Sequence, residues 1–120
     1  MKLYFADDPE EWLDWPVILR RCFDEDRVFY SRHARNEMRN EELGPISDGE
    51  VYEAIVSGDV IESYPEDQPY PSVLVLGQTK RSRPLHIVCA YARPDDRVIV
   101  VTVYQPDPER WAADFRRRKS

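Results

Sequence analysis

The sequence predicts an α+β domain in which N-terminal helices pack on one face of a four-stranded, mainly antiparallel sheet. Most helix signals are in the first half of the chain, and runs rich in valine and isoleucine dominate the second half. The connections between these runs are short, which favours antiparallel neighbours. A length of 120 residues, 42% of them hydrophobic, fits one domain with a modest core.

Three helices are expected in the first half, each preceded by a side chain that can accept hydrogen bonds from the first free backbone N–H groups. Asp14 and Ser31 are such caps, and Ser47 has a capping-box partner in Glu50. Apolar residues at helical spacing then give each helix a face for the core. The expected helices cover residues 14–23, 31–43 and 47–58, with core positions Trp12, Trp15, Ile18, Leu19, Phe23, Ala34, Met38, Val51, Ala54 and Ile55.

Four strands follow, each bounded by turn residues. They are expected at residues 60–64, 72–78, 85–92 and 98–104. Strict alternation along the last strand puts Thr102 and Tyr104 on one face and Ile99 on the other. If the helices cover the more apolar face of the sheet, His86 shares the exposed face with Thr102 and Tyr104. That face would suit an extended anionic ligand.

The chain divides into an acidic N-terminal extension, residues 1–26, packed on a single domain of residues 27–120. The extension holds eight acidic residues and three basic ones. Its aromatic and apolar side chains suit an extra helix that completes the core. The other interpretation is that it folds over a cationic site as an internal mimic of nucleic acid. At the opposite end, a short helix is expected to dock Trp111 and Phe115 on the domain.

Composition excludes several classes of protein. The net charge of −6 opposes indiscriminate binding of polyanions. No run of about 18 apolar residues predicts a membrane span, and the N-terminus lacks a secretory signal, so we expect a cytoplasmic, bacterial protein. Cys22 and Cys89 have bulky apolar neighbours, which favours two buried thiols over a disulfide. Motifs for zinc, nucleotides or other cofactors are missing, so we expect neither a metal nor a cofactor.

Cationic side chains gather in three places in this acidic chain. In "SRHARNEMR" (31–39), Arg32, Arg35 and Arg39 fall on one stripe of the expected helix, with His33 beside them. The other two places are the hairpin loop with Lys80, Arg81 and Arg83, and the tail "RRRK" (116–119). Guanidinium groups bind phosphate oxygens, and imidazole transfers protons near neutral pH. A solvated helix face paired with glutamates, an ordinary hairpin tip, and histidines and tyrosines that only pack are the alternatives left open.

Four phrases together resemble a known family. They are "YSRHARNEM", "VIESYPEDQPYPSVLVLG", "RPLHIVCAY" and "VIVVTVYQPDPERW". The order and spacing of these phrases, and the rare residues in them, are similar to those of the bacterial family called domain of unknown function 4258. The resemblance implies a relation to RelE/ParE/BrnT-like toxins, with a RelE-like toxin architecture of helices on a curved antiparallel sheet. Glu37 departs from the pattern, because members often carry arginine before the motif methionine.

The resemblance also implies an activity: metal-free ribonuclease action by the toxin of a type II toxin–antitoxin pair. Such cleavage needs a base for the 2′-OH proton, a cation for the phosphorane charge, and an acid for the 5′-oxygen. The predicted catalytic residues are His33, His86 and Tyr104, and the predicted phosphate- and RNA-binding residues are Arg32, Arg35, Arg39, Tyr70, Lys80, Arg81 and Arg83. The expected partners are RNA and a cognate antitoxin, with a homodimer left open. The alternative function is a non-catalytic protein-interaction module.

Overall fold

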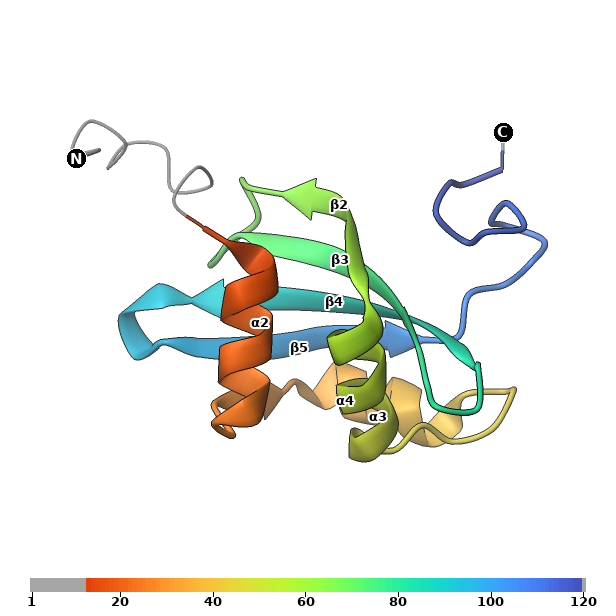
Figure 1. Ribbon diagram of the computed structural model, residues 1–120, viewed down its shortest axis with the longest axis horizontal. Helices are drawn as coiled ribbons and strands as arrows, with labels where there is room; N and C mark the ends of the chain where they lie inside the picture. The colour runs from red at the N-terminus through yellow and green to blue at the C-terminus, as the bar shows by residue number, and fades with distance from the viewer. Residues whose placement is uncertain (1–12, 120) are drawn as a thin grey trace.

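The computed structural model describes residues 13–119 and shows an α+β fold built on one five-stranded sheet (Figure 1). The strand order is β1-β5-β4-β3-β2. In chain order the elements are α2 (Trp15–Asp24), β1 (Val28–Tyr30), α3 (Arg32–Asn40), α4 (Asp48–Ser57), β2 (Asp59–Tyr64), β3 (Ser72–Gln78), β4 (Pro84–Ala92), the 3₁₀ turn η2 (Arg93–Asp95) and β5 (Arg97–Tyr104). The first part of the predicted extension, residues 1–12 with Trp12, lies outside the described residues.

The predicted α+β class is confirmed, but the prediction of four strands in a mainly antiparallel sheet is wrong in one respect. β1 adds a fifth strand, and it pairs in parallel with β5, which makes the sheet mixed. The other neighbouring strands are antiparallel, as predicted. A strand of three residues is too short to show a period of two, and its partner lies about 70 residues further along the chain. No local pattern in the sequence could therefore reveal it.

The helices begin where their caps predict. The side chains of Asp14 and Ser31 accept from backbone N–H groups three residues on, and Ser47 and Glu50 form the capping box. Figure 1 shows α2 and α4 crossing one face of the sheet. The predicted core positions of the described helices are buried in one cluster with the strands, and Phe23 packs against it partly buried. Cys22 and Cys89 are buried free thiols, as predicted.

The helix α2 belongs to the core of the molecule. Its buried residues, Trp15, Ile18, Leu19 and Cys22, pack with those of the sheet. Arg21 adds a polar attachment, because its guanidinium donates to Asp96 in the turn between β4 and β5. The described part of the extension therefore packs as an extra helix, on the sheet face that α4 also covers.

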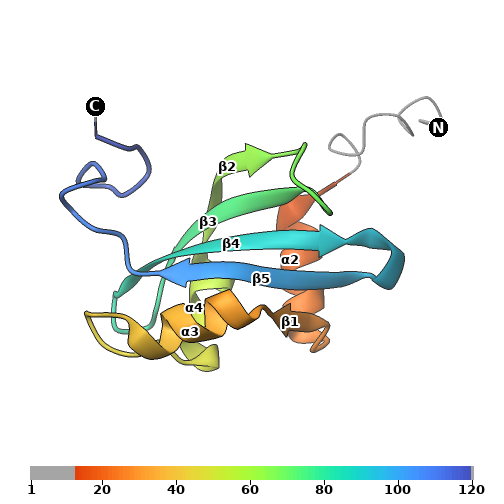
Figure 2. The same cartoon turned by 180° about the vertical axis from the view of Figure 1, so that it is seen from behind.

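The helix α3 lies alongside β5 and caps its edge beyond β1 (Figure 2). Glu37 Oε1 accepts from the Val103 N–H at 3.0 Å, and Glu41 Oε1 accepts from the Gln105 N–H at 2.9 Å. Four residues of helix rise about 6 Å, and two residues of strand rise about 6.8 Å, so the two spacings match. Exposed edge N–H groups invite pairing with other chains, and these carboxylates occupy them. Glu41 leaves the helical conformation to do so, which ends α3 at Asn40 and not at residue 43.

Replacing Glu37 with alanine is expected to lower the free energy of unfolding by about 1–2 kcal/mol, because the Val103 N–H loses its acceptor. Glu37→Gln keeps an acceptor oxygen and should cost less. Glu42→Ala, at an exposed position one residue beyond Glu41, is the matched control and should change little. Urea unfolding measures all three, and equal stability of the Glu37→Ala and Glu42→Ala proteins would contradict the edge-capping role.

A bulge in β5 overturns the predicted alternation of that strand. Val100 pairs with Cys89 and Thr102 pairs with Val88, so Val101 has no partner on β4. The extra residue shifts every position before it to the other face. Ile99 therefore shares a face with Tyr104 and was wrongly placed opposite it. A continuous run of valine and isoleucine gives no sign of which residue is extra.

The prediction of a helix at the C-terminal end is also wrong. Residues 106–119, here called the strap, form an irregular segment that turns back on itself (dark blue beyond β5 in Figure 1). Trp111 and Arg118 form an isolated bridge across it. Backbone hydrogen bonds across the strap, Ala112 N–H to Arg117 O and Lys119 N–H to Arg110 O, take the place of the bonds four residues apart that a helix would make. Trp111 is buried as expected, and Phe115 is half-buried.

Within residues 13–119 none of the helices is both long enough and apolar enough to cross a bilayer.

Candidate functional site

A group of polar side chains occupies the sheet face opposite α2 and α4, and we call it the sheet-face cluster. The register of β4 and β5 places His86 directly opposite Tyr104, so the two share a face, as the sequence predicted. Glu62 and Tyr64 come from β2, and Arg118 comes from the strap. Residues from three strands and the C-terminal segment thus meet on one face.

His86 is fully buried and uses both ring nitrogens. Its Nδ1 lies 3.1 Å from Tyr104 Oη, and its Nε2 lies 2.8 Å from the carbonyl oxygen of Phe115. A carbonyl oxygen only accepts, so we assign the proton to Nε2 and let Nδ1 accept from the Tyr104 hydroxyl. The Trp111 ring packs edge-on against the imidazole, with centroids 4.3 Å apart. The prediction that His86 and Tyr104 lie side by side on one sheet face is confirmed. The prediction that this face is exposed is wrong at His86, because the strap covers it.

Burial gives His86 a pH-dependent effect on stability. Desolvation lowers its pKa below the ordinary value of 6.5, against the opposing hydrogen bond with the Phe115 carbonyl. At pH values between the lowered pKa and 6.5, His86 therefore binds more protons in the unfolded chain than in the folded chain. Lowering the pH in this range favours the unfolded state. The contribution of His86 to the free energy of unfolding therefore increases as the pH rises.

The free energy of unfolding is thus expected to increase with pH across this range. Urea unfolding measured from about pH 5.5 to 7.5 should show this slope in the wild type and in His33→Gln. In His86→Gln the slope should be lost or much reduced. A slope that is unchanged in His86→Gln would show that another group causes it.

The second half of the cluster is the ion pair of Glu62 and Arg118, joined by the neutral hydroxyl of Tyr64. The Tyr64 hydroxyl donates to Glu62 Oε1, and Arg118 Nη2 lies 3.2 Å from the same oxygen. Burial would raise the pKa of Glu62, but the hydrogen bonds from Tyr64 and Arg118 outweigh it and lower the pKa. Burial and the neighbouring carboxylate raise the pKa of Tyr64 to about 12. At neutral pH the cluster therefore offers an anionic Glu62, a cationic Arg118 and a neutral His86.

The arginines predicted to bind phosphate do not join this cluster. Arg35 pairs with Asp48 and stacks on the Tyr30 ring, with the guanidinium carbon 3.9 Å from the ring centroid. Arg83 is largely buried and bonds four residues in three segments of the fold. The remaining predicted cations, Arg32, Arg39, Lys80 and Arg81, are exposed on α3 and on the hairpin between β3 and β4. Tyr70 lies in the loop before β3, toward the opposite end of β4 from His86.

The predicted catalytic residue His33 lies in a neighbouring hollow. Its side chain is 67% exposed, and its Nε2 is 3.3 Å from Glu37. The hollow is lined by His33, Asn36, Glu37, Asn40, Glu41, Glu42 and Tyr104. Three carboxylates make it unfavourable for a phosphate. Tyr104 thus stands between His33 and the buried His86, and the two histidines do not share one pocket.

A basic hollow beside Tyr104 was not predicted as a site. It has a volume of about 710 Å³ and is lined by Tyr104, Gln105, Asp107, Glu109, Arg110, Trp111, Arg118 and Lys119. The sequence does show a basic tail, but only the docking of Trp111 reveals where that tail lies. Glu62 and Tyr64 were missed because they lie on β2, and only the sheet register brings that strand toward the strap.

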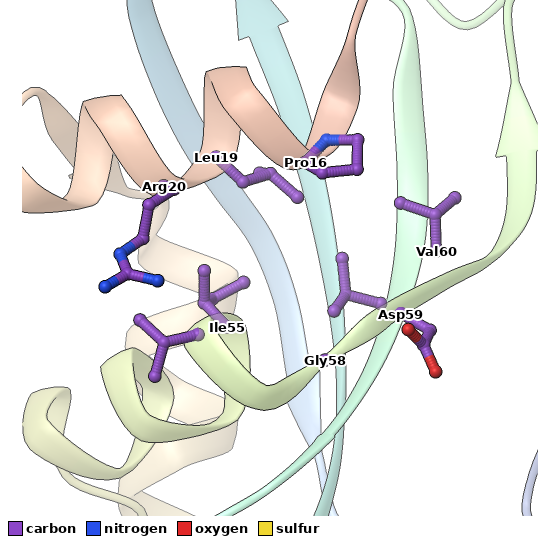
Figure 3. Close-up of a pocket in the computed structure, with 9 residues that line it drawn as sticks. Pro16, Leu19, Arg20, Ile55, Gly58, Asp59 and Val60 are labelled. Carbon is purple, nitrogen blue, oxygen red and sulfur yellow. The ribbon is translucent and has the colours of Figure 1, made fainter.

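An apolar cleft lies on the other side of the molecule, between α2, α4 and the start of β2 (Figure 3). It measures about 270 Å³, and Leu19, Ile55 and Val60 line it. Arg20 and Asp59 are at its rim, but Arg20 pairs with Asp24 and Asp59 pairs with a strap arginine. Its charged groups are therefore already paired within the fold.

Metal binding has no visible basis in the described part of the chain. Among residues 13–119, the histidine, cysteine, aspartate and glutamate side chains form no group of three or more that could hold an ion.

Comparison with known proteins places the chain in a family. Residues 30–105 match the model of DUF4258, described as a domain of unknown function. No curated protein and no solved structure matches the chain. The matched stretch runs from the last residue of β1 to the residue after β5, so it includes His86 and Tyr104 and leaves out the strap. The match covers well over half of the chain and agrees with the resemblance in the sequence, so the chain belongs to the DUF4258 family.

Proposed function

We propose that the protein is a metal-independent ribonuclease, the toxin of a type II toxin–antitoxin pair, and that RNA is cleaved at the sheet-face cluster. The observation that carries the proposal is the hydrogen bond between His86 and Tyr104 beside the ionised pair of Glu62 and Arg118. Together these side chains supply proton acceptors, proton donors and a phosphate-binding cation on one surface.

The reaction needs no metal when such groups are present. A base, His86 or Glu62, takes the proton of the ribose 2′-OH, and the 2′-oxygen attacks phosphorus. The bond from phosphorus to the 5′-oxygen breaks, and an acid returns a proton to that oxygen, leaving a 2′,3′-cyclic phosphate. Arg118 balances the charge of the phosphorane, and Tyr104 orients the imidazole. The need for a 2′-OH makes the substrate RNA and not DNA.

The catalytic prediction is tested with single-stranded RNA in excess EDTA. His86→Gln is expected to slow cleavage about 100-fold or more, as the loss of a general base or acid does. Arg118→Gln should raise the KM for RNA, because the phosphate loses its cation. Arg93→Gln, which removes an exposed arginine from η2 between β4 and β5, is the matched control and should cleave like the wild type. Equal rates for the wild type and His86→Gln would remove the catalytic assignment.

The toxin assignment is tested by controlled expression in a bacterium. Growth arrest with loss of messenger RNA is expected for the wild type, and neither is expected for His86→Gln. Arrest by both proteins would mean that toxicity does not depend on the sheet-face cluster.

The alternative, a non-catalytic protein-interaction module, is favoured by a specific observation. His86 has both nitrogens satisfied in the interior, and Arg35 and Arg83 are engaged within the fold. Binding to RNA should weaken steeply with salt, whereas binding to a protein partner through apolar side chains should not. RNA binding that is absent at low salt in a folded protein would favour this alternative.

A further inference from the structure

We infer that the strap is an intramolecular inhibitor of the sheet-face cluster: the Phe115 carbonyl oxygen takes the place of a phosphate oxygen beside His86, and RNA reaches the cluster only when the strap lifts. This inference rests on the proposed function, because it concerns the regulation of the same site.

The contacts of the strap lie on the groups that the reaction would use. The Phe115 oxygen is 2.8 Å from His86 Nε2, the distance at which a bound phosphate oxygen would accept the same hydrogen bond. Trp111 covers the imidazole ring, and Arg118 stacks on Trp111 while it pairs with Glu62. With the strap closed, His86 has no surface in contact with solvent. The closed chain and a substrate therefore cannot occupy the cluster together.

The strap can lift without breaking the sheet. Its backbone-to-backbone hydrogen bonds join strap residues to one another, as in Ala112 N–H to Arg117 O and Lys119 N–H to Arg110 O. Two ion pairs tie it to β2, Arg116 with Asp59 and Arg118 with Glu62, and at least one partner in each is well exposed. Exposed ion pairs contribute little to stability and weaken with salt. The buried side chains that anchor the strap are Pro106 and Trp111.

The Arg118 guanidinium gives RNA a means of opening the strap. In the closed state it is paired with the carboxylate of Glu62. A phosphate is a competing anion for the same fork of donors. If the Arg118 guanidinium exchanges Glu62 for a substrate phosphate, one of the two ion pairs that hold the strap on β2 is released, and Arg118 stays on that phosphate as residues 111–115 lift off His86.

The conformation of Phe115 provides a matched pair of variants. Its φ is 61°, in the left-handed region that glycine adopts without cost and proline cannot adopt. Phe115→Pro and Phe115→Gly both remove the phenyl ring, and both keep Arg116 and Arg118. Only the proline variant forbids the turn that presents the carbonyl to His86. Phe115→Pro is therefore expected to open the strap, and Phe115→Gly to leave it closed.

The test measures access to His86 in the full-length chain. Each protein is treated with diethyl pyrocarbonate, and the modification of the two histidines is followed by peptide mass mapping, with the exposed His33 as internal reference. Relative to His33, His86 should react at least about tenfold faster in Phe115→Pro than in the wild type or Phe115→Gly, since protection reports the closed population. Circular dichroism checks that the sheet is intact. Equal protection of His86 in Phe115→Pro and the wild type would overturn the inference.

The same proteins, incubated with RNA in EDTA, separate the inference from the proposed function. Faster cleavage by Phe115→Pro than by the wild type and Phe115→Gly is expected. Exposure of His86 without cleavage by any of the proteins would refute the ribonuclease and keep the strap as a cover. Cleavage at one common rate by all three would refute the inhibition and keep the ribonuclease.

Discussion

Replacing Gly77 with alanine is expected to lower the free energy of unfolding by about 3 kcal/mol or more, a large part of the stability of a small domain. Gly77 lies on β3 under the C-terminal end of α4. A Cβ atom there would be 1.8 Å from the carbonyl oxygen of Ala54 and 2.5 Å from its carbonyl carbon. These are backbone atoms of a helix and not the end of a flexible side chain, so the helix itself would have to move away from the sheet.

Gly49→Ala is the matched control for this prediction. Gly49 is in the first turn of α4, and the nearest atom to an added Cβ is Ser47 Oγ at 3.8 Å, an ordinary contact. Alanine is the better helix former, so this variant should gain about 0.5–1 kcal/mol. Urea unfolding of both proteins measures the difference. If the two substitutions change the free energy of unfolding alike, the backbone of α4 at Ala54 does not lie against Gly77 of β3.

The close approach at Gly77 illustrates which features the sequence could predict. Ser31 and Ser47 mark helix starts because a cap acts on N–H groups two or three residues away, within reach of a local pattern. That His86 and Tyr104 share a face follows from the period of two along each strand, whereas their direct pairing comes from the register, which the sequence does not give. The features that the sequence did not predict depend on distant partners. They are the parallel pairing of β1, the bulge at Val101 and the docking of Trp111 on His86.

The family phrases are better explained by the fold than by a shared active site. In "YSRHARNEM", Ala34 and Met38 are buried in the core. Gly77 in "VLVLG" lets α4 lie on β3. The exceptions are His86 and Tyr104, with Glu62 and Tyr64 of "VIESY", which combine family phrases with the chemistry of a site. A match to these phrases therefore predicts the architecture well and the position of the predicted arginines poorly.

Arg83→Ala is expected to cost about 3 kcal/mol of stability, because four acceptors lose the same largely buried, charged donor at once. The Arg83 guanidinium donates to the carbonyl oxygens of Gly44 and Pro45, the latter at 3.0 Å. It also donates to Glu50 at 3.2 Å and to Gln105 at 2.8 Å. These contacts join the loop before α4, the first turn of α4 and the end of β5.

Arg83→Lys distinguishes this structural role from the predicted phosphate-binding role. An ammonium group keeps the charge but cannot reach acceptors on three sides, so most of the stability loss should persist. Arg81→Ala, which removes an exposed arginine from the same hairpin, should leave stability within about 0.5 kcal/mol of the wild type. Urea unfolding and RNA affinity are then measured on the same three proteins. A fall in RNA affinity in Arg83→Lys with unchanged stability would restore Arg83 as an RNA-binding residue, whereas lost stability assigns it to the fold.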